Sequence, residues 1–352
     1  MSIHPTHCVA FFQDLVIIDE ASQSDVMVLP GMLRGTQWLM VGDSKQISPT
    51  ENFITEEQIE SLRASLPPSP LEDSLMPGHS FFDLCAQAFP QGVVLLSEHF
   101  RCAEEIIQFS NEQFYDGRLV PLRLPTKSER LTPSIIDVKV EGVKTGKVNQ
   151  VEANKIVEMI QEFVAQDQGD AVSSNPRTIG IISLIGDEQD RLIRGRVSDA
   201  LGPHKMTSHH TLVIIPPTFQ GAERDVVFLS MVASPGSVPT QNQIMNVQRV
   251  NVAMSRARDR CVLVRSIDSH HIKLAVIEFF ETAAAAGDTR ENTGALASDA
   301  VGGERWEGSS IDVLLQTLLE QRGFIVCSMG VVWKNAICVE HESEDQRAAL
   351  IV

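Results

Sequence analysis

Residues 15–23 have the sequence LVIIDEASQ, in which four consecutive apolar residues are followed directly by the carboxylates of Asp19 and Glu20. A run of Leu, Val and Ile without polar alternation is typical of a strand that is covered on both faces, as in the parallel sheets of α/β proteins. Further runs of this kind occur at 38–43, 93–96, 178–185, 211–215, 225–232 and 261–264, with helical stretches between them. The chain is therefore predicted to have an α/β fold built on parallel sheets.

One helical stretch, at 151–166, shows the pattern of a helix that lies on a sheet. Its apolar residues Val157, Ile160, Phe163 and Val164 recur at spacings of three and four residues. Such spacing places them in one stripe, and the stripe is expected to pack on the strands. We therefore interpret this helix as structural.

The composition changes at two places along the chain. Residues 50–80 contain the sequence PPSP and little strand character, which indicates a connector. After about residue 282 the chain is small and polar, which indicates a flexible linker. Residues 309–333 then predict a helix that ends near Gly323, followed by a strand.

The overall composition limits the class of protein. The chain has 29 Lys plus Arg and 46 Asp plus Glu, a net charge of −17, and 43% hydrophobic residues, which suits a globular protein. No apolar run approaches the roughly 20 residues that cross a bilayer, and the first residues lack the features of a signal peptide. Six cysteines without a CxxC pair suit reduced thiols. We therefore expect an intracellular protein, cytoplasmic or nuclear, with no membrane partner. The acidic net charge does not exclude binding of nucleic acid. Electrostatic fields add up locally, over about a Debye length, so a local cationic groove can bind phosphates whatever the total charge.

The carboxylates of Asp19 and Glu20 are the first candidates for chemistry. The carboxyl edge of a parallel sheet is where ligands gather, and nucleotide hydrolases hold magnesium with acids placed in this way. Asp19 would then hold the metal, directly or through water, and Glu20 would polarise an attacking water. The alternative is that the pair forms a solvated turn.

A second candidate follows about 20 residues later in the sequence VGDSKQISP, residues 41–49. Gln46 lies on a loop after the next apolar run, where a glutamine can sense a γ-phosphate or a water, and Gly42 would allow a tight turn. A simple turn is again the alternative, but the distance from residues 15–23 favours a shared function.

Five segments, taken in order, resemble motifs II to VI of superfamily 1 helicases of the nonsense-mediated-decay type. They are LVIIDEASQ, VGDSKQISP, LSEHFRCAEEIIQFSNEQFYDGRL, PPTFQGAERDVVFLSMV and QRVNVAMSRARDRCVLV, within residues 12–268. The resemblance implies two RecA-like domains with ATP and Mg²⁺ bound in the cleft between them. It also implies coupling of ATP hydrolysis to movement along single-stranded or duplex nucleic acid, either DNA or RNA.

The same resemblance implies a domain organisation. Residues 1–85 would be a partial first RecA-like domain with its connector, and residues 86–281 a complete second one. Residues 282–305 would form a linker. Residues 306–352 would form a short α/β tail that is similar to the opening helix and strand of a restriction-endonuclease-like domain. The metal-binding aspartate expected on the next strands is not found there, so a nuclease is not predicted.

The resemblance also implies roles for individual residues. Asp19 matches the magnesium-binding aspartate, Glu20 the water-activating glutamate and Gln46 the glutamine near the γ-phosphate. Arg101 matches an arginine that reaches the γ-phosphate from the second domain, although His99 and Phe100 replace the usual Gln-Tyr before it.

Motifs V and VI supply the remaining residues. Gly221 matches a glycine that permits close backbone approach, and Glu223 a glutamate that contacts the ribose or a water beside the phosphates. Arg256 matches the arginine finger, whose planar guanidinium suits charge spread over phosphoryl oxygens. Arg258 is interpreted as part of a surface salt bridge, in preference to a second phosphate-binding arginine.

The sequence does not contain the phosphate-loop pattern GxxxxGK[ST], which in this class lies upstream of motif II. We therefore expect the first RecA-like domain to lack its initial strands, and the isolated chain to have no robust ATPase activity. Two other hypotheses stay open: a non-catalytic helicase remnant that binds nucleic acid or regulates by association, and a nucleoside triphosphatase unrelated to nucleic acid. Oligomeric state is not predicted.

Overall fold

A computed structural model of the chain describes residues 13–25, 28–47, 79–123, 130–167, 175–214, 222–236, 244–271 and 274–292, the single residues 61, 64 and 169, and three strands after residue 323. It divides the chain into two compact units. The first contains Met1–Asp43, Pro49–Pro90 and Leu296–Val352, and the second contains Ser44–Ser48 and Gln91–Ala295.

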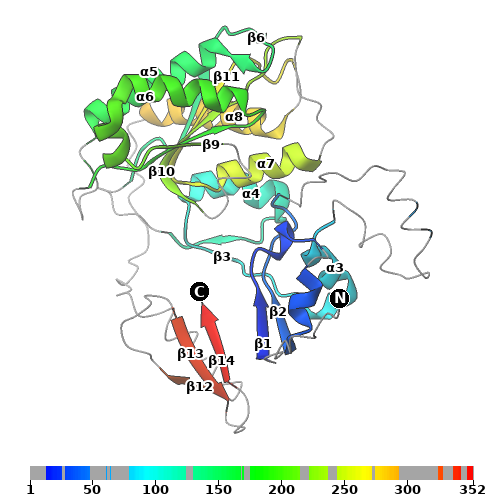
Figure 1. Cartoon of the computed structure of the whole chain (residues 1–352). Helices are drawn as coiled ribbons and strands as arrows, with labels where there is room; N and C mark the ends of the chain where they lie inside the picture. Colours follow the sequence, from blue (N-terminus) through cyan, green and yellow to red (C-terminus); the bar gives the residue numbers. More distant parts are fainter. Residues whose placement is uncertain are drawn as a thin grey trace, which may run out of the picture. The chain divides into compact units, whose positions relative to one another are not determined.

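The second unit is built on a five-stranded, fully parallel sheet with the strand order β5-β11-β10-β8-β9 (Figure 1). Its strands are β5 (Ile135–Lys139), β8 (Ile179–Ser183), β9 (Leu212–Ile214), β10 (Arg224–Ser230) and β11 (Ala257–Arg265). This sheet confirms the α/β prediction. Four of its strands lie where the uninterrupted apolar runs predict them.

Helices cover both faces of this sheet, which explains why its strands are apolar throughout. On one face α5 (Gln150–Gln166) and α6 (Glu188–Ser208) pack on the strands, and Ile156, Ile160 and Ile193 are completely buried there. On the other face lie α4 (Glu104–Phe114), α7 (Ile244–Met254) and α8 (Ala275–Asn292).

The helix α5 confirms the prediction for residues 151–166, and its start has a clear local cause. The side chain of Asn149 accepts hydrogen bonds from the backbone nitrogens of Val151 and Glu152, which satisfies two of the free donors at the helix start. The buried stripe differs in detail from the prediction, because Ala153 and Ile156 are buried whereas Phe163 is only partly buried.

In the first unit, β1 (Gln13–Ile18) pairs in parallel with β2 (Gly35–Met40), so both predicted strands are present. A short 3-10 helix η1 (Ala21–Gln23) and helix α1 (Leu29–Met32) connect them. Helix α3 (Phe81–Ala88) begins at Ser80, whose hydroxyl accepts a hydrogen bond from the backbone nitrogen of Asp83.

Gly42, expected to allow a tight turn, has a different role. A Cβ atom at this position would lie 2.9 Å from the backbone nitrogen of Ser22 and 2.9 Å from a ring carbon of Phe82. Glycine is therefore required because η1 and α3 approach the chain too closely for any side chain.

The apolar run at 93–96 is not a strand, which corrects the prediction for that segment. Its residues belong to no strand or helix, and Val94 and Leu96 are both 81% exposed. A two-residue strand, β3 (Glu98–His99), follows and pairs in parallel with β4 (Val120–Pro121). A short hairpin of β6 (Lys144–Thr145) and β7 (Val148–Asn149) precedes α5.

Beyond the second unit's sheet, α8 continues past residue 281, where the linker is expected to begin. Strands β12 (Phe324–Cys327), β13 (Ala336–His341) and β14 (Arg347–Ile351) form an antiparallel sheet. The helix predicted at 309–323 lies outside the described residues. Within the described part of the chain, no helix combines the length and apolar character needed to span a bilayer.

Candidate functional site

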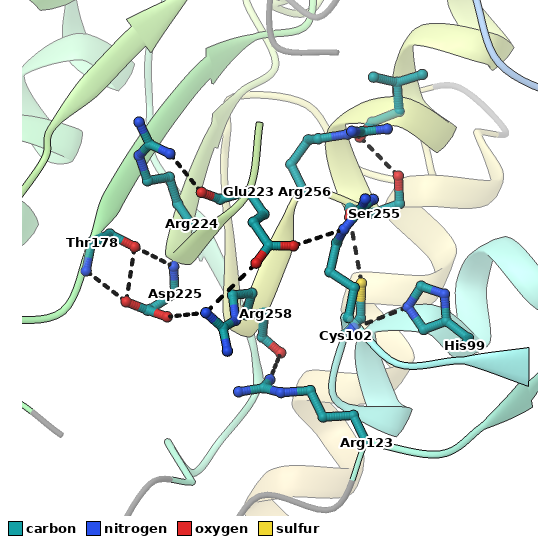
Figure 2. A network of polar contacts seen from close by, with 12 residues as sticks. His99, Cys102, Arg123, Thr178, Glu223, Arg224, Asp225, Ser255, Arg256 and Arg258 are labelled. Atoms are coloured by element: carbon teal, nitrogen blue, oxygen red, sulfur yellow. Dashed lines mark hydrogen bonds and ion pairs between the residues drawn. The ribbon is translucent and has the colours of Figure 1, made fainter. Parts of the chain in front are cut away.

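A group of charged and polar side chains gathers where the strands of the second unit begin. Thr178 directly precedes β8, Glu223 precedes β10, and Arg256 precedes β11. Because the strands are parallel and adjacent, their starts meet at one edge of the sheet (Figure 2). This amino edge carries the residues that the sequence assigns to motifs IV to VI.

Glu223 lies between two guanidinium groups. Its Oε2 accepts a hydrogen bond from Nε of Arg101 at 3.0 Å, and its Oε1 lies 3.6 Å from Nη1 of Arg258. The side chains of Arg101 and Glu223 are 34% and 44% exposed, so a dissolved anion can compete for the arginine. The ion pair with Glu223 therefore leaves Arg101 accessible to an anion such as phosphate, which could replace the carboxylate as its partner.

Arg258 belongs to this cluster through ion pairs of a partly exposed side chain, as the surface salt-bridge interpretation predicts. Besides Glu223, its Nη1 lies 3.7 Å from Oδ1 of Asp225. The other oxygen of Asp225 accepts hydrogen bonds from both the backbone nitrogen and the hydroxyl of Thr178, at 2.7 and 2.8 Å. Thr178 thus fixes Asp225, and Asp225 helps to fix Arg258 (Figure 2).

Arg123 is a member of the site that sequence reasoning missed. Its Nη1 donates to the backbone oxygen of Arg258 at 2.5 Å, and its Nη2 lies 2.6 Å from Oδ1 of Asp259. Both side chains of this ion pair are largely buried, at 13% and 7% exposure. The surrounding sequence, PLRLPT, carries no signal for such a role, because the partner lies more than a hundred residues away in the chain.

Arg256 is buried and contacts Gln46. Its Nε donates to the backbone oxygen of Val252 at 3.1 Å, and its Nη2 donates to Oε1 of Gln46 at 3.4 Å. Gln46 follows β2 in the chain but belongs to the second unit, with Ser44–Ser48. Two residues that the resemblance assigns to the γ-phosphate are therefore in direct contact.

His99 has a structural task beside Arg101. Its Nε2 accepts a hydrogen bond from the backbone nitrogen of Cys102 at 2.9 Å, which requires a neutral ring. Burial, assisted by the charge of Arg101, lowers the pKa of His99 to about 4. Burial also raises the pKa of the Cys102 thiol to about 12, so this cysteine is not a nucleophile at neutral pH.

Asp19 and Glu20 belong to the first unit, directly after β1. Oδ1 of Asp19 accepts a hydrogen bond from the backbone nitrogen of Glu20 at 2.8 Å, and both residues are exposed. Glu20 has φ 52°, a left-handed conformation that is unfavourable for a residue with a side chain. Strain of this kind is concentrated at functional positions, which favours a role beyond a solvated turn.

The structure thus brings together Arg101 with Glu223, and Gln46 with Arg256, all in the second unit. Asp19 and Glu20 are neighbours in the first unit. Gly221, the remaining candidate, lies outside the described residues.

Comparison with known protein families shows that residues 78–268, more than half of the chain, match the AAA domain family AAA_12. The chain belongs to this AAA domain family. Most of the AAA domain match falls on the second unit, so the residues clustered at the amino edge of its sheet lie within the family's extent.

Several curated proteins resemble this AAA domain chain, and they are helicases. An uncharacterized ATP-dependent helicase of Methanocaldococcus jannaschii is 22% identical over 71% of this chain and 35% of its own length. The DNA replication ATP-dependent helicase/nuclease dna2 of Schizosaccharomyces pombe is 25% identical over 73% of this chain and 19% of its own length. The chain therefore spans about a third or less of these relatives. Their similarity confirms the coarser part of the resemblance, that to superfamily 1 helicases.

Among solved structures, the complex of the arterivirus nonstructural protein 10 helicase with DNA has a TM-score of 0.34 and 13% identity. The match covers 74% of this chain and 41% of that one.

Proposed function

We propose that this chain supplies the γ-phosphate-facing part of an ATP-dependent nucleic-acid helicase or translocase of the nonsense-mediated-decay type. In this proposal Gln46, Arg101 and Arg256 bind the terminal phosphate, and closure around it drives movement on single-stranded or duplex nucleic acid. Family membership and the helicase relatives support the proposal. The observation that carries it is the contact between Gln46 and Arg256.

The chemistry of the arginines fits a phosphate ligand. A guanidinium stays charged at all working pH values and offers a planar set of donors to phosphoryl oxygens. Arg101 is now paired with a half-exposed carboxylate, so binding a triphosphate exchanges one exposed ion pair for another at low cost. Glu223 then acts as the resting partner of Arg101, in addition to the nucleotide contact that the resemblance implies.

Asp19 and Glu20 are assigned the complementary task on the first unit. No cluster of three or more His, Cys, Asp or Glu side chains in the described ranges could hold a metal ion by itself. Mg²⁺ in nucleotide sites takes one or two carboxylates, with phosphate oxygens and waters completing the shell, and the exposed carboxylate of Asp19 fits that donor set. Bound there, Mg²⁺ would neutralise phosphate charge. Glu20 would orient the attacking water by hydrogen bonding.

The absence of GxxxxGK[ST] from the sequence leads us to propose that the isolated chain binds nucleotide weakly and does not turn it over. The domain boundaries inferred from the resemblance and an intracellular, cytoplasmic or nuclear location are parts of the same proposal.

The test is binding of a fluorescent single-stranded oligonucleotide by the purified chain, with and without a non-hydrolysable ATP analogue and Mg²⁺. Helicase-type coupling predicts binding that weakens with rising salt and changes with the analogue. Arg256→Ala should abolish the response to the analogue and leave the salt dependence intact. Salt-dependent binding that ignores the analogue would instead establish the non-catalytic remnant. The absence of any oligonucleotide binding would reject both and favour a triphosphatase unrelated to nucleic acid. ATP turnover that is lost in Glu20→Gln would disprove the proposed inactivity.

A further inference from the structure

We propose that Gln248 and Asn251 of α7 are positioning residues, which fix the loop around Gln46 so that Gln46 and Arg256 meet the γ-phosphate as one rigid group. This inference rests on the proposed function for the role of the γ-phosphate. The docking of the loop on α7 stands on geometry alone.

Two side chains of α7 hold the backbone of the loop. Nε2 of Gln248 donates to the backbone oxygen of Ser44 at 3.3 Å, and Nδ2 of Asn251 donates to the backbone oxygen of Lys45 at 2.9 Å. The two residues are three positions apart on the helix and therefore share one face. Both are almost completely buried, at 6% and 2% exposure, although Ser44 and Lys45 themselves are exposed.

The amide of Asn251 has its orientation fixed by this task. Its Nδ2 also donates to the hydroxyl of Tyr115 at 3.2 Å, so both hydrogens are used. Its Oδ1 is buried and has no hydrogen-bond partner among the described residues. Turning the amide over would place Oδ1 against the Lys45 carbonyl oxygen, which cannot donate, and would move the amide hydrogens to the side where Oδ1 now has no partner. An unpaired buried acceptor costs about 1–3 kcal/mol. The amide of Asn251 is therefore oriented to bind the loop and Tyr115 through its hydrogens, although its own oxygen stays without a partner among the described residues.

Arg256 is held from the same helix. Its Nε donates to the Val252 carbonyl near the end of α7, and its Nη2 reaches Gln46. Three anchors, from Gln248, Asn251 and Arg256, therefore bind consecutive residues of the loop, namely Ser44, Lys45 and Gln46. A displacement of α7 carries the glutamine and the arginine together.

The first arm of the test is hydrogen exchange of the full chain, read on peptides that contain residues 44–47. Asn251→Asp keeps the size of the side chain but replaces the donor with an oxygen that faces the Lys45 carbonyl. We expect exchange in this segment to become about five- to tenfold faster, as loss of one net hydrogen bond implies. Asn154→Asp, on the exposed side of α5, adds the same charge elsewhere and should leave the segment unchanged. Unchanged exchange in Asn251→Asp, with folding confirmed by circular dichroism, would overturn the docking.

The second arm measures the preference of the chain for a Mg-bound ATP analogue over Mg-ADP. Asn251→Asp and Gln46→Ala should each lower this preference by a similar factor while leaving ADP affinity unchanged. The double variant should be no worse than Gln46→Ala, because Asn251 acts through Gln46. Additive losses would overturn the positioning role. A wild-type chain that does not prefer the ATP analogue would reject the proposed function, whereas the exchange result would still decide whether α7 holds the loop.

Discussion

The Glu152 carboxylate accepts a hydrogen bond from the backbone nitrogen of Val232 at 2.8 Å, and Val232 has the left-handed φ of 55°. This conformation is rare for a β-branched residue, so the bond helps to hold a strained turn just after β10. The hydroxyls of Ser230 and Ser266 also donate to the same carboxylate, at 2.8 and 3.0 Å. Glu152 is completely buried, and burial raises its pKa to about 7 despite these bonds.

This buried carboxylate predicts that the chain loses stability as the pH rises. Between the ordinary pKa of 4.5 and about 7, the folded protein retains a proton that the unfolded chain has released. The free energy of unfolding therefore falls across this window, by about 3 kcal/mol for this group. Glu152→Gln should remove that slope, and Glu162→Gln, on the exposed part of the same helix, should keep it. Urea unfolding at pH 5, 6, 7 and 8 measures the difference, and parallel slopes for wild type and Glu152→Gln would contradict it.

His99 should act in the opposite direction. Its pKa is lowered to about 4, so between that value and 6.5 the unfolded chain binds a proton that the folded protein does not. Its contribution to stability is present above pH 6.5 and is lost as the pH falls toward 4. Glutamine can still accept the hydrogen bond from the Cys102 nitrogen, so His99→Gln should fold and should resist acid better than wild type. Acid titration followed by far-UV circular dichroism tests this, and an earlier acid transition in the variant would refute it.

The close approach around Gly42 predicts that Gly42→Ala destabilises the first unit by about 1–3 kcal/mol, since overpacking displaces backbone rather than a flexible side chain. Gly31 in α1 is the matched control, because a Cβ there meets nothing within 4 Å. Gly31→Ala should be neutral or slightly stabilising. Thermal unfolding followed by tryptophan fluorescence compares the two, and equal melting temperatures would show that the site can relax.

The two ion pairs of the amino-edge cluster should differ greatly in their effect on stability. Arg123→Met leaves the buried Asp259 carboxylate unpaired and should cost about 3 kcal/mol. Arg101→Met removes a pair that is a third or more exposed and should cost less than about 1 kcal/mol. Urea unfolding at pH 7 measures both. A larger loss for Arg101→Met would mean that this arginine is a structural residue and not one available to a ligand.

The strands β8, β9, β10 and β11 could be predicted because each is an uninterrupted apolar run, the signal of a strand buried on both faces. β5 was missed because its sequence, IIDVK, contains two charges. These charges are compensated by distant residues: Arg265 binds Asp137 through two hydrogen bonds, and Asp268 binds Lys139. Local sequence cannot show such pairing.

The run at 93–96 shows the opposite error, since the sequence predicts a strand and none forms. Apolar character alone does not provide a neighbouring strand with which to pair. The site was predictable to the extent that short motifs mark it, at Arg101, Glu223 and Arg256. The anchors at Arg123, Gln248 and Asn251 depend on tertiary contacts with residues far along the chain, and no spacing rule reveals them.

Strands β10 and β11 begin at the amino edge, beside Arg224 and Arg256. They end beside Ser230 and Ser266, which bind the Glu152 carboxylate. β10 alone separates Arg224 from Ser230 by roughly 20 Å, and the raised pKa of Glu152 is caused by its own burial, opposed by hydrogen bonds from its immediate neighbours. Changes to the arginine cluster should therefore leave the titration of Glu152 almost untouched. An arginine variant in which Glu152 titrates as it does in wild type has therefore kept an intact second unit.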